Sequence, residues 1–229
     1  MTELIRENVA AVRAEIGRAA EKAKKENVRL IAAVKYADAE ELTALLEAGI
    51  DEVGENRVQQ LLDREAIYAK YRPRVHFIGT LQTNKVKYIA DKVDMIHSVD
   101  SLRLAAEIER RAAEHDRVID VLVEINGARE SSKTGVFPED APALCRAILQ
   151  MSHLRLCGFM TMGPRFESDA AYTAYFAGVR QCGEEIFSAL GIKEKPLFSM
   201  GMSESFTAAV AAGADMVRVG RRLFQSETN

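Results

Sequence analysis

Segments in which apolar residues recur at helical spacing alternate along the chain with short apolar runs typical of strands. In residues 3–26 they recur at intervals of three and four, which predicts an amphipathic helix. The run Val28–Val34 is too short for a helix and rich in branched side chains, which predicts a strand. Residues 39–48 return to the helical period, and Gly49 follows at the position that favours glycine after a helix.

The same strand-and-helix unit repeats through the rest of the sequence. Seven further strands are predicted at 52–54, 75–78, 95–99, 119–125, 154–160, 197–200 and 216–219. The helical segments between them lie near 57–70, 84–92, 101–115, 139–151, 169–190 and 204–212. Strands that alternate with helices are typical of parallel βαβ units. Eight units predict an α/β fold, a single (β/α)8 TIM-type barrel with an extra N-terminal helix, as one domain over residues 1–229.

An open doubly wound sheet is the alternative fold. It is disfavoured because no G-x-G-x-x-G motif follows any predicted strand, and no glycine-rich P-loop is present.

The charge balance argues against two classes of partner. With 31 Lys+Arg against 34 Asp+Glu, no global basic field is available to hold a nucleic acid. No apolar run reaches the ~20 residues that span a bilayer, and residues 1–26 lack the apolar block of a signal peptide. We therefore expect neither a nucleic acid nor a membrane as partner.

Cysteine and histidine spacing bears on compartment and metal binding. The three cysteines are odd in number and form no C-x-x-C pair, which favours a reducing, cytoplasmic location. The four histidines show no metal-ligand spacing with each other or with the cysteines, so we expect no metal site.

Lys35 follows the first predicted strand, and barrels carry their functional residues at the C-terminal ends of strands. By alternation, Lys35 shares a face with Ile31 and Ala33. If that face points into the barrel, apolar surroundings lower the pKa of the amine and suit Schiff-base formation with an aldehyde. The alternative is a solvated lysine leading into the next helix, which is the commoner case at a barrel rim.

Arg218 interrupts the apolar last strand and shares a face with Met216 and Gly220. Such an arginine either pairs outward with an acidic helix residue or reaches an anion or acceptor in the barrel mouth. Gly220 removes a side chain where a ligand would approach the backbone. The residues alone leave both orientations of Arg218 open.

The seventh strand ends in Ser-Met-Gly-Met-Ser at 199–203, directly before a predicted helix. A hydroxyl and free backbone N–H groups at a helix start favour a phosphate, and the loops after barrel strands seven and eight frequently bind one. Ordinary N-capping by Ser203 is the alternative, and both roles can coexist.

Seven short motifs run in a fixed order between about Leu30 and Phe224. They are Ala32–Tyr36, Gly54–Gln59, His76–Lys85, Ser132–Gly135, Gly158–Met162, Ser199–Ser203 and Val217–Gly220. Each is weak by itself, but the ordered set resembles the pyridoxal phosphate homeostasis proteins of the YggS/PROSC type.

This resemblance implies a barrel like the N-terminal domain of alanine racemase, carrying pyridoxal 5′-phosphate (PLP). It implies that Lys35 is the Schiff-base lysine and that Arg218 faces the pyridine nitrogen. Ser203, with the backbone of Gly220 and Arg221, resembles the family's phosphate cradle. The other positions implied at the cofactor are Asn56, Ser199, Met200 and Gly201.

The resemblance also implies a role in PLP homeostasis, in which PLP is held as an internal aldimine on Lys35 and carried or buffered. No catalytic residue is expected, because a permanent cation beside the ring nitrogen disfavours its protonation and makes the ring a poorer electron sink. We also expect no second domain of the kind that gives alanine racemase an opposing tyrosine. Candidate partners are PLP-dependent apo-enzymes, and a monomer is expected.

The alternative function is an enzyme, a PLP-dependent amino-acid racemase or a related activity that is weak. A purely regulatory partner of other proteins is compatible with the carrier role, but no partner surface is identified in the sequence.

Overall fold

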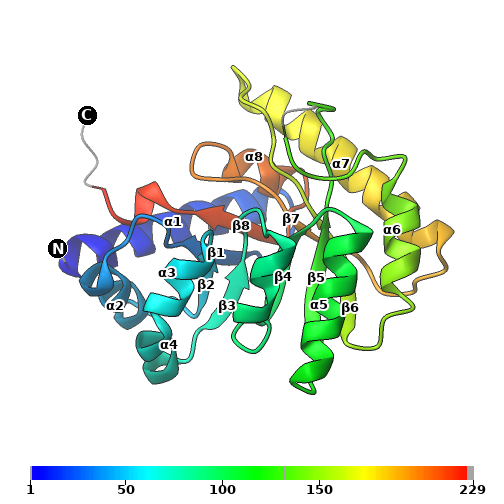
Figure 1. The fold of residues 1–229 in the computed structure, drawn as a ribbon. Helices are drawn as coiled ribbons and strands as arrows, with labels where there is room; N and C mark the ends of the chain where they lie inside the picture. The colour runs from blue at the N-terminus through cyan, green and yellow to red at the C-terminus, as the bar shows by residue number, and fades with distance from the viewer. Residues whose placement is uncertain (1, 131–132, 226–229) are drawn as a thin grey trace.

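The computed structural model describes residues 2–130 and 133–225, and within them eight strands form a closed barrel (Figure 1). Each strand is parallel to the next one along the chain, and β8 pairs with β1 to close the sheet. The strands are β1 (Arg29–Ala33), β2 (Glu52–Glu55), β3 (Arg74–Phe77), β4 (Met95–Val99), β5 (Ile119–Glu124), β6 (Leu154–Met160), β7 (Leu197–Ser199) and β8 (Met216–Val219). The predicted (β/α)8 barrel is confirmed, and the open doubly wound sheet is wrong.

The helices surround this barrel, and most follow the predicted ranges. They are α1 (Thr2–Lys22), α2 (Ala39–Glu47), α3 (Val58–Asp63), α4 (Glu65–Tyr71), α5 (Leu102–Glu114), α6 (Ala141–Ile148), α7 (Asp169–Ala189) and α8 (Phe206–Ala211), with 3-10 helices η1 (Thr83–Tyr88) and η2 (Arg221–Leu223). The extra N-terminal helix, α1, packs against α2 and α8 through Ile5, Val9, Val12 and Ile16.

Two of the predicted helices differ from the observed ones. The segment predicted at 57–70 is divided into α3 and α4 at Arg64, whose side chain turns inward. Its guanidinium donates to Glu55 Oε1 at 2.9 Å and to the carbonyl oxygen of Ala37. The segment predicted at 84–92 forms the short 3-10 helix η1 followed by turns.

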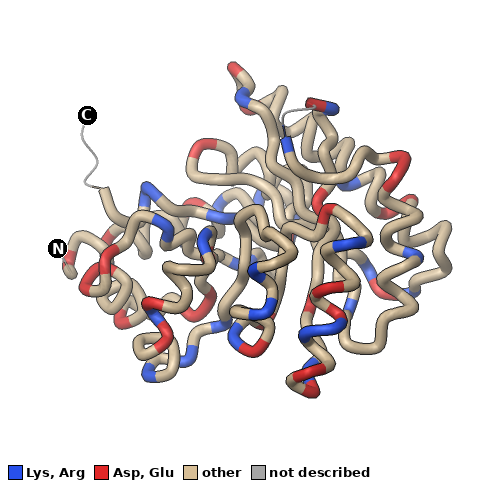
Figure 2. Tube along the Cα trace, in the orientation of Figure 1, with Lys and Arg blue, Asp and Glu red and all other residues tan. Residues whose placement is uncertain are grey.

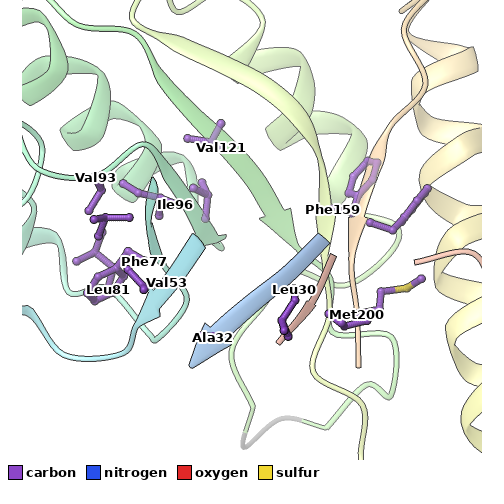
Figure 3. Close-up of a cluster of buried hydrophobic side chains, with 14 of the residues drawn as sticks. Leu30, Ala32, Val53, Phe77, Leu81, Val93, Ile96, Val121, Phe159 and Met200 are labelled. Atoms are coloured by element: carbon purple, nitrogen blue, oxygen red, sulfur yellow. The ribbon is translucent and has the colours of Figure 1, made fainter. Parts of the chain in front are cut away.

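Alternate side chains of each strand face either the barrel interior or the helices. In β1, Ile31 and Ala33 point inward, while Leu30 and Ala32 join the larger core between sheet and helices (Figure 3). The inner apolar cluster is small, comprising Ile31, Ala33, Ile78, Met95, Leu122, Met160 and Met216. Buried polar side chains occupy much of the remaining interior, among them Glu52, His76, His97, Ser199 and Arg218. Buried polar groups of this kind require hydrogen-bond partners.

Charged residues of both signs are interspersed along the chain (Figure 2). Within the described ranges, no helix is long and apolar enough to cross a membrane. All three cysteines, Cys145, Cys157 and Cys182, are free thiols. The cytoplasmic location stays a prediction.

Candidate cofactor-binding site

A cavity of about 430 Å³ opens at the C-terminal end of the barrel. Residues at the ends of β1, β2, β3, β6 and β8 line it, together with the loop between β7 and α8. Seven of the nine predicted positions belong to this lining, namely Lys35, Asn56, Gly201, Ser203, Arg218, Gly220 and Arg221. The structure therefore brings most of the predicted site together, from segments spread over nearly the whole sequence.

Lys35 lies two residues beyond the end of β1, in the turn before α2. Its side chain is exposed, and its Nζ lies 4.8 Å from the centroid of the Tyr36 ring. The face that it was predicted to share with Ile31 and Ala33 does point into the barrel. The turn after β1 carries Lys35 out of the barrel interior and into its mouth. The Lys35 amine is therefore not enclosed by apolar side chains as expected.

Arg218 is buried in the barrel beneath this mouth, and the outward orientation is wrong. Its Nη1 donates to the carbonyl oxygen of Ser199 at 2.7 Å and to Ser199 Oγ at 2.6 Å. Its Nη2 donates to the carbonyl oxygen of Thr161 at 2.9 Å. Burial lowers the pKa of Arg218 to about 10, and the nearby Glu124 acts in the opposite direction. The group remains a cation at neutral pH and is anchored by three hydrogen bonds.

Ser203 and Gly220 meet at one side of the cavity, where the Gly220 N–H donates to Ser203 Oγ at 3.3 Å. Because α8 begins at Phe206, Ser203 does not cap that helix, and the alternative of ordinary N-capping by Ser203 is wrong. In the described part of the chain, the backbone N–H groups of Ser203, Glu204 and Arg221 have no acceptor. A hydroxyl and several unengaged N–H groups thus converge on one place.

The backbone at Gly220 passes too close to β1 for a side chain to fit comfortably. A Cβ at this position would lie 3.0 Å from the carbonyl oxygen of Ala33. The adjacent Arg221 directs its guanidinium to Glu204, 2.9 Å away, and Arg165 contacts the same carboxylate at 3.4 Å. The acidic Glu204 is therefore neutralised by two arginines at the rim.

Asn56 follows β2 and is one of the residues that line the cavity. Its Oδ1 is buried and has no hydrogen-bond partner among the described residues. Gly79 allows the close approach of the two loops, since a Cβ there would lie 2.3 Å from the carbonyl oxygen of Asn56. The preceding Glu55 is fixed by Arg64 and by the hydroxyl of Tyr68. Burial, followed by the charge of Glu55, raises the pKa of that hydroxyl, which stays protonated as a donor.

Sequence comparison relates this chain to known proteins over nearly its full length. The family described as alanine racemase, N-terminal domain, matches residues 8–227. The pyridoxal phosphate homeostasis protein of Aquifex aeolicus is 37% identical over 220 residues, covering 95% of this chain and 96% of the relative. That of Pseudomonas aeruginosa is 36% identical over 222 residues, covering 96% and 94%. The chain belongs to the pyridoxal phosphate homeostasis protein family. The resemblance seen in the ordered motifs is thus confirmed.

Solved structures give the same family relationship. PipY of Synechococcus elongatus, solved with PLP bound, has a TM-score of 0.86 at 30% identity, covering 96% of this chain and 100% of PipY. Alanine racemase from Corynebacterium glutamicum has a TM-score of 0.71 at 15% identity, and this chain covers 62% of it. The second likeness is one of fold, in agreement with the predicted alanine racemase-like barrel.

Two positions that the family resemblance implied at the cofactor do not line the cavity. Ser199 lies behind Arg218 and reaches the site through that side chain. Met200 is fully buried in the outer core near Phe159 (Figure 3). Side chains alternate along the chain here, so that Ser199 facing inward turns Met200 outward. The Met200 side chain therefore points away from the cavity.

Several residues that line the cavity were not predicted from the sequence. Tyr172 and Phe176 of α7 and Arg165 in the preceding loop reach the cavity from outside the strand ends. The hydrophobic pattern of the sequence could not indicate these residues, because the way in which α7 packs on the barrel decides which of its side chains face the mouth. No group of histidine, cysteine and acidic side chains suitable for a metal occurs in the described ranges.

Proposed function

We propose that this protein binds PLP in the cavity at the C-terminal end of the barrel and holds it covalently through Lys35. The observation that carries the proposal is the presence of three complementary groups in one cavity. These are the exposed amine of Lys35, the buried cation of Arg218, and the hydroxyl and N–H groups around Ser203. PipY, which has been solved with PLP bound, supports the same ligand.

The chemistry of the donor set fits PLP group by group. When bound, PLP supplies an aldehyde that condenses with a primary amine, releasing one water, and Lys35 Nζ is the amine we assign to that bond. The phosphate would be held by Ser203 and by the backbone of Gly220 and Arg221. The N–H groups of Ser203 and Arg221, which have no acceptor among the described residues, favour an anion. Asn56 Oδ1, buried without a partner, would accept a hydrogen bond at the ring.

Arg218 is assigned to the ring nitrogen, as in the family resemblance. A permanent cation at that position disfavours protonation of the nitrogen, which weakens the ring as an electron sink. We therefore propose that the protein, as a monomer in the cytoplasm, carries or buffers PLP and passes it to PLP-dependent apo-enzymes without strong catalysis of its own. Relatives named pyridoxal phosphate homeostasis proteins support this role.

Proton exchange distinguishes the carrier from an enzyme. PLP-loaded protein incubated with L-alanine in deuterated water is expected to exchange the α-proton no faster than free PLP at the same concentration, as followed by proton NMR. The matched reference is the same mixture with Lys35→Ala protein. Exchange well above the rate of free PLP, lost in that variant, would instead establish racemase-type catalysis.

Ser203→Ala is expected to weaken PLP binding roughly fivefold, the effect of removing about 1 kcal/mol of hydrogen bonding. The dissociation constant can be measured by absorbance titration of the protein with PLP. Ser188→Ala, which changes an exposed serine near the end of α7, is the control. An unchanged dissociation constant in Ser203→Ala would mean that the hydroxyl takes no part in holding the phosphate.

A further inference from the structure

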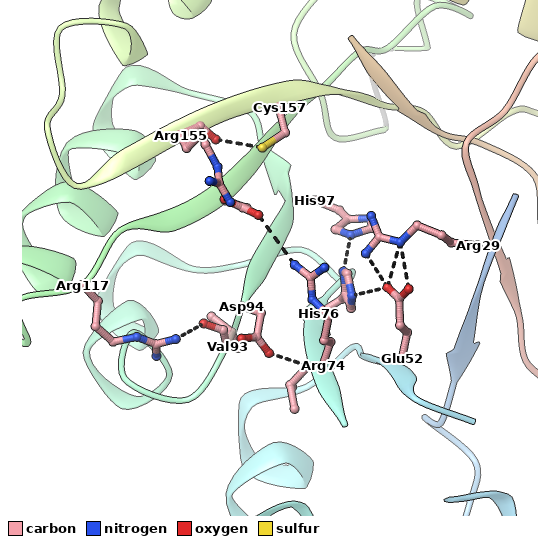
Figure 4. Close-up of polar contacts among 12 residues, drawn as sticks. Arg29, Glu52, Arg74, His76, Val93, Asp94, His97, Arg117, Arg155 and Cys157 are labelled. Atoms are coloured by element: carbon pink, nitrogen blue, oxygen red, sulfur yellow. Dashed lines mark hydrogen bonds and ion pairs between the residues drawn. The ribbon is translucent and has the colours of Figure 1, made fainter. Parts of the chain in front are cut away.

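A chain of polar side chains crosses the barrel interior and ends at Arg218. Its members come from six different strands and are linked by hydrogen bonds and ion pairs, in the order Arg29, Glu52, His76, His97, Ser199 and Arg218. Both histidines and Ser199 are completely buried. Figure 4 shows the part of the chain from Arg29 to His97, in which Arg29 and His76 both contact Glu52 and a dashed line joins His76 to His97.

Each link along the chain is 2.6–3.0 Å long, and all but the contact between His76 and Glu52 also have the angles of a hydrogen bond. Arg29 Nε lies 2.8 Å from Glu52 Oε1, and Glu52 Oε2 lies 2.9 Å from His76 Nε2. His76 Nδ1 is 2.9 Å from His97 Nε2, and the two rings stand nearly perpendicular. His97 Nδ1 is 3.0 Å from Ser199 Oγ.

The hydrogens on Ser199, His97 and His76 can be placed because Arg218 can only donate and the carboxylate of Glu52 can only accept. Arg218 can only donate, so Ser199 Oγ accepts from it and has its one hydrogen left for His97 Nδ1. His97 must then carry its hydrogen on Nε2 and donate to His76 Nδ1. His76 in turn carries its hydrogen on Nε2, which faces the carboxylate of Glu52. Each histidine carries one ring hydrogen in this arrangement, and the hydrogens of Ser199, His97 and His76 all point away from the cavity.

The reverse arrangement requires an additional buried charge. If His97 donated from Nδ1 to Ser199, His76 would have to donate from Nδ1 and also keep a hydrogen on Nε2 for Glu52, becoming a cation. Glu52 is already paired with Arg29, and Arg218 is a second buried cation nearby. Burial, together with the charges of Arg218 and Arg29, also holds the pKa of His97 well below its usual range, which disfavours placing the additional charge on His97. The neutral arrangement is therefore favoured.

We propose that His97, backed by His76 and Glu52, is a positioning residue for the arginine that faces the cofactor ring. By accepting the Ser199 hydrogen, His97 leaves the serine oxygen turned toward Arg218 Nη1, so that the guanidinium is held in one orientation. This inference rests on the proposed function, since Arg218 is assigned to the PLP ring nitrogen there. The interior of the barrel thus has a part in cofactor binding, through residues that do not touch the cavity.

The tautomers can be observed directly in the protein without added PLP. Nitrogen-15 NMR correlation spectra of the imidazole rings are expected to show the ring hydrogen of both His76 and His97 on Nε2, with His115 and His153 as internal references. A hydrogen on His97 Nδ1, or a doubly protonated His76, would overturn the proposal. This result does not depend on whether PLP binds.

A double-mutant cycle tests whether His97 acts through Ser199. His97→Phe is expected to weaken PLP binding on the order of tenfold, the loss of one hydrogen bond that supports a charged group. In a Ser199→Ala background the same substitution should have less than about a twofold effect. His97→Asn, whose amide oxygen lies near the place of Nδ1, should restore most of the affinity.

Two outcomes separate this inference from the proposed function. Equal weakening by His97→Phe in both backgrounds would mean a general structural role for His97 and would overturn the positioning role. Absence of PLP binding by the unaltered protein would instead refute the proposed function. Should His97→Phe fail to fold, the His97→Asn cycle and the tautomer measurement still decide the question.

Discussion

Lys35→Ala is expected to remove the absorbance band near ~420 nm that a lysine-bound PLP gives, and to leave PLP removable by gel filtration. The reason is that Lys35 provides the amine at the barrel mouth to which the aldehyde can be bonded, while the remaining contacts are noncovalent. Absorbance spectra of the protein before and after addition of PLP, followed by desalting, measure both effects.

Lys87→Ala is the matched control for this experiment. Lys87 is also exposed and lies 4.9 Å from the ring centroid of Tyr88, much as Lys35 lies beside Tyr36. The control variant should keep the full band. A Lys35→Ala protein that kept the band after desalting would show that another amine holds the cofactor.

Arg64→Met is expected to destabilise the fold by about 3–5 kcal/mol, because it leaves the carboxylate of Glu55 buried without its cation. Glu55 is completely buried, and among the residues that the structure describes only Tyr68 would remain as its donor. Urea unfolding followed by circular dichroism measures the change. A loss of this size is a large part of the stability of an ordinary domain, about 5–15 kcal/mol.

Arg6→Met provides the comparison, since the Arg6–Glu3 pair on α1 is exposed. Its loss should change the free energy of unfolding by less than about 1 kcal/mol. The double variant Arg64→Met with Glu55→Gln should recover part of the loss, because the buried charge is then gone. Similar effects of Arg64→Met and Arg6→Met would contradict the burial argument.

The barrel could be predicted from the sequence because its strands and helices follow different periods. Most strands are short and rich in apolar residues, and most helices have an apolar face, so the order of elements is largely a local property. The break at Arg64 could not be predicted in this way. It depends on a hydrogen bond to Ala37, which lies 27 residues earlier in the chain.

The candidate site was predictable to the extent that it follows strand ends. Ser203 and Gly220 could be placed because the barrel gathers those ends at one mouth. The outward turn of Met200 could also have been found, since it follows from the inward position of Ser199. The contact between His97 and Ser199 could not, because nothing local to either residue indicates a partner 102 residues away.

The central claim is that PLP is held on Lys35 in this cavity. Reduction of the PLP-loaded protein with borohydride, followed by proteolysis and mass spectrometry, identifies the lysine that carries the cofactor. The account predicts a reduced phosphopyridoxyl group on Lys35 at close to one per chain. Modification of a different lysine, or scattered substoichiometric labelling of surface lysines, would contradict it.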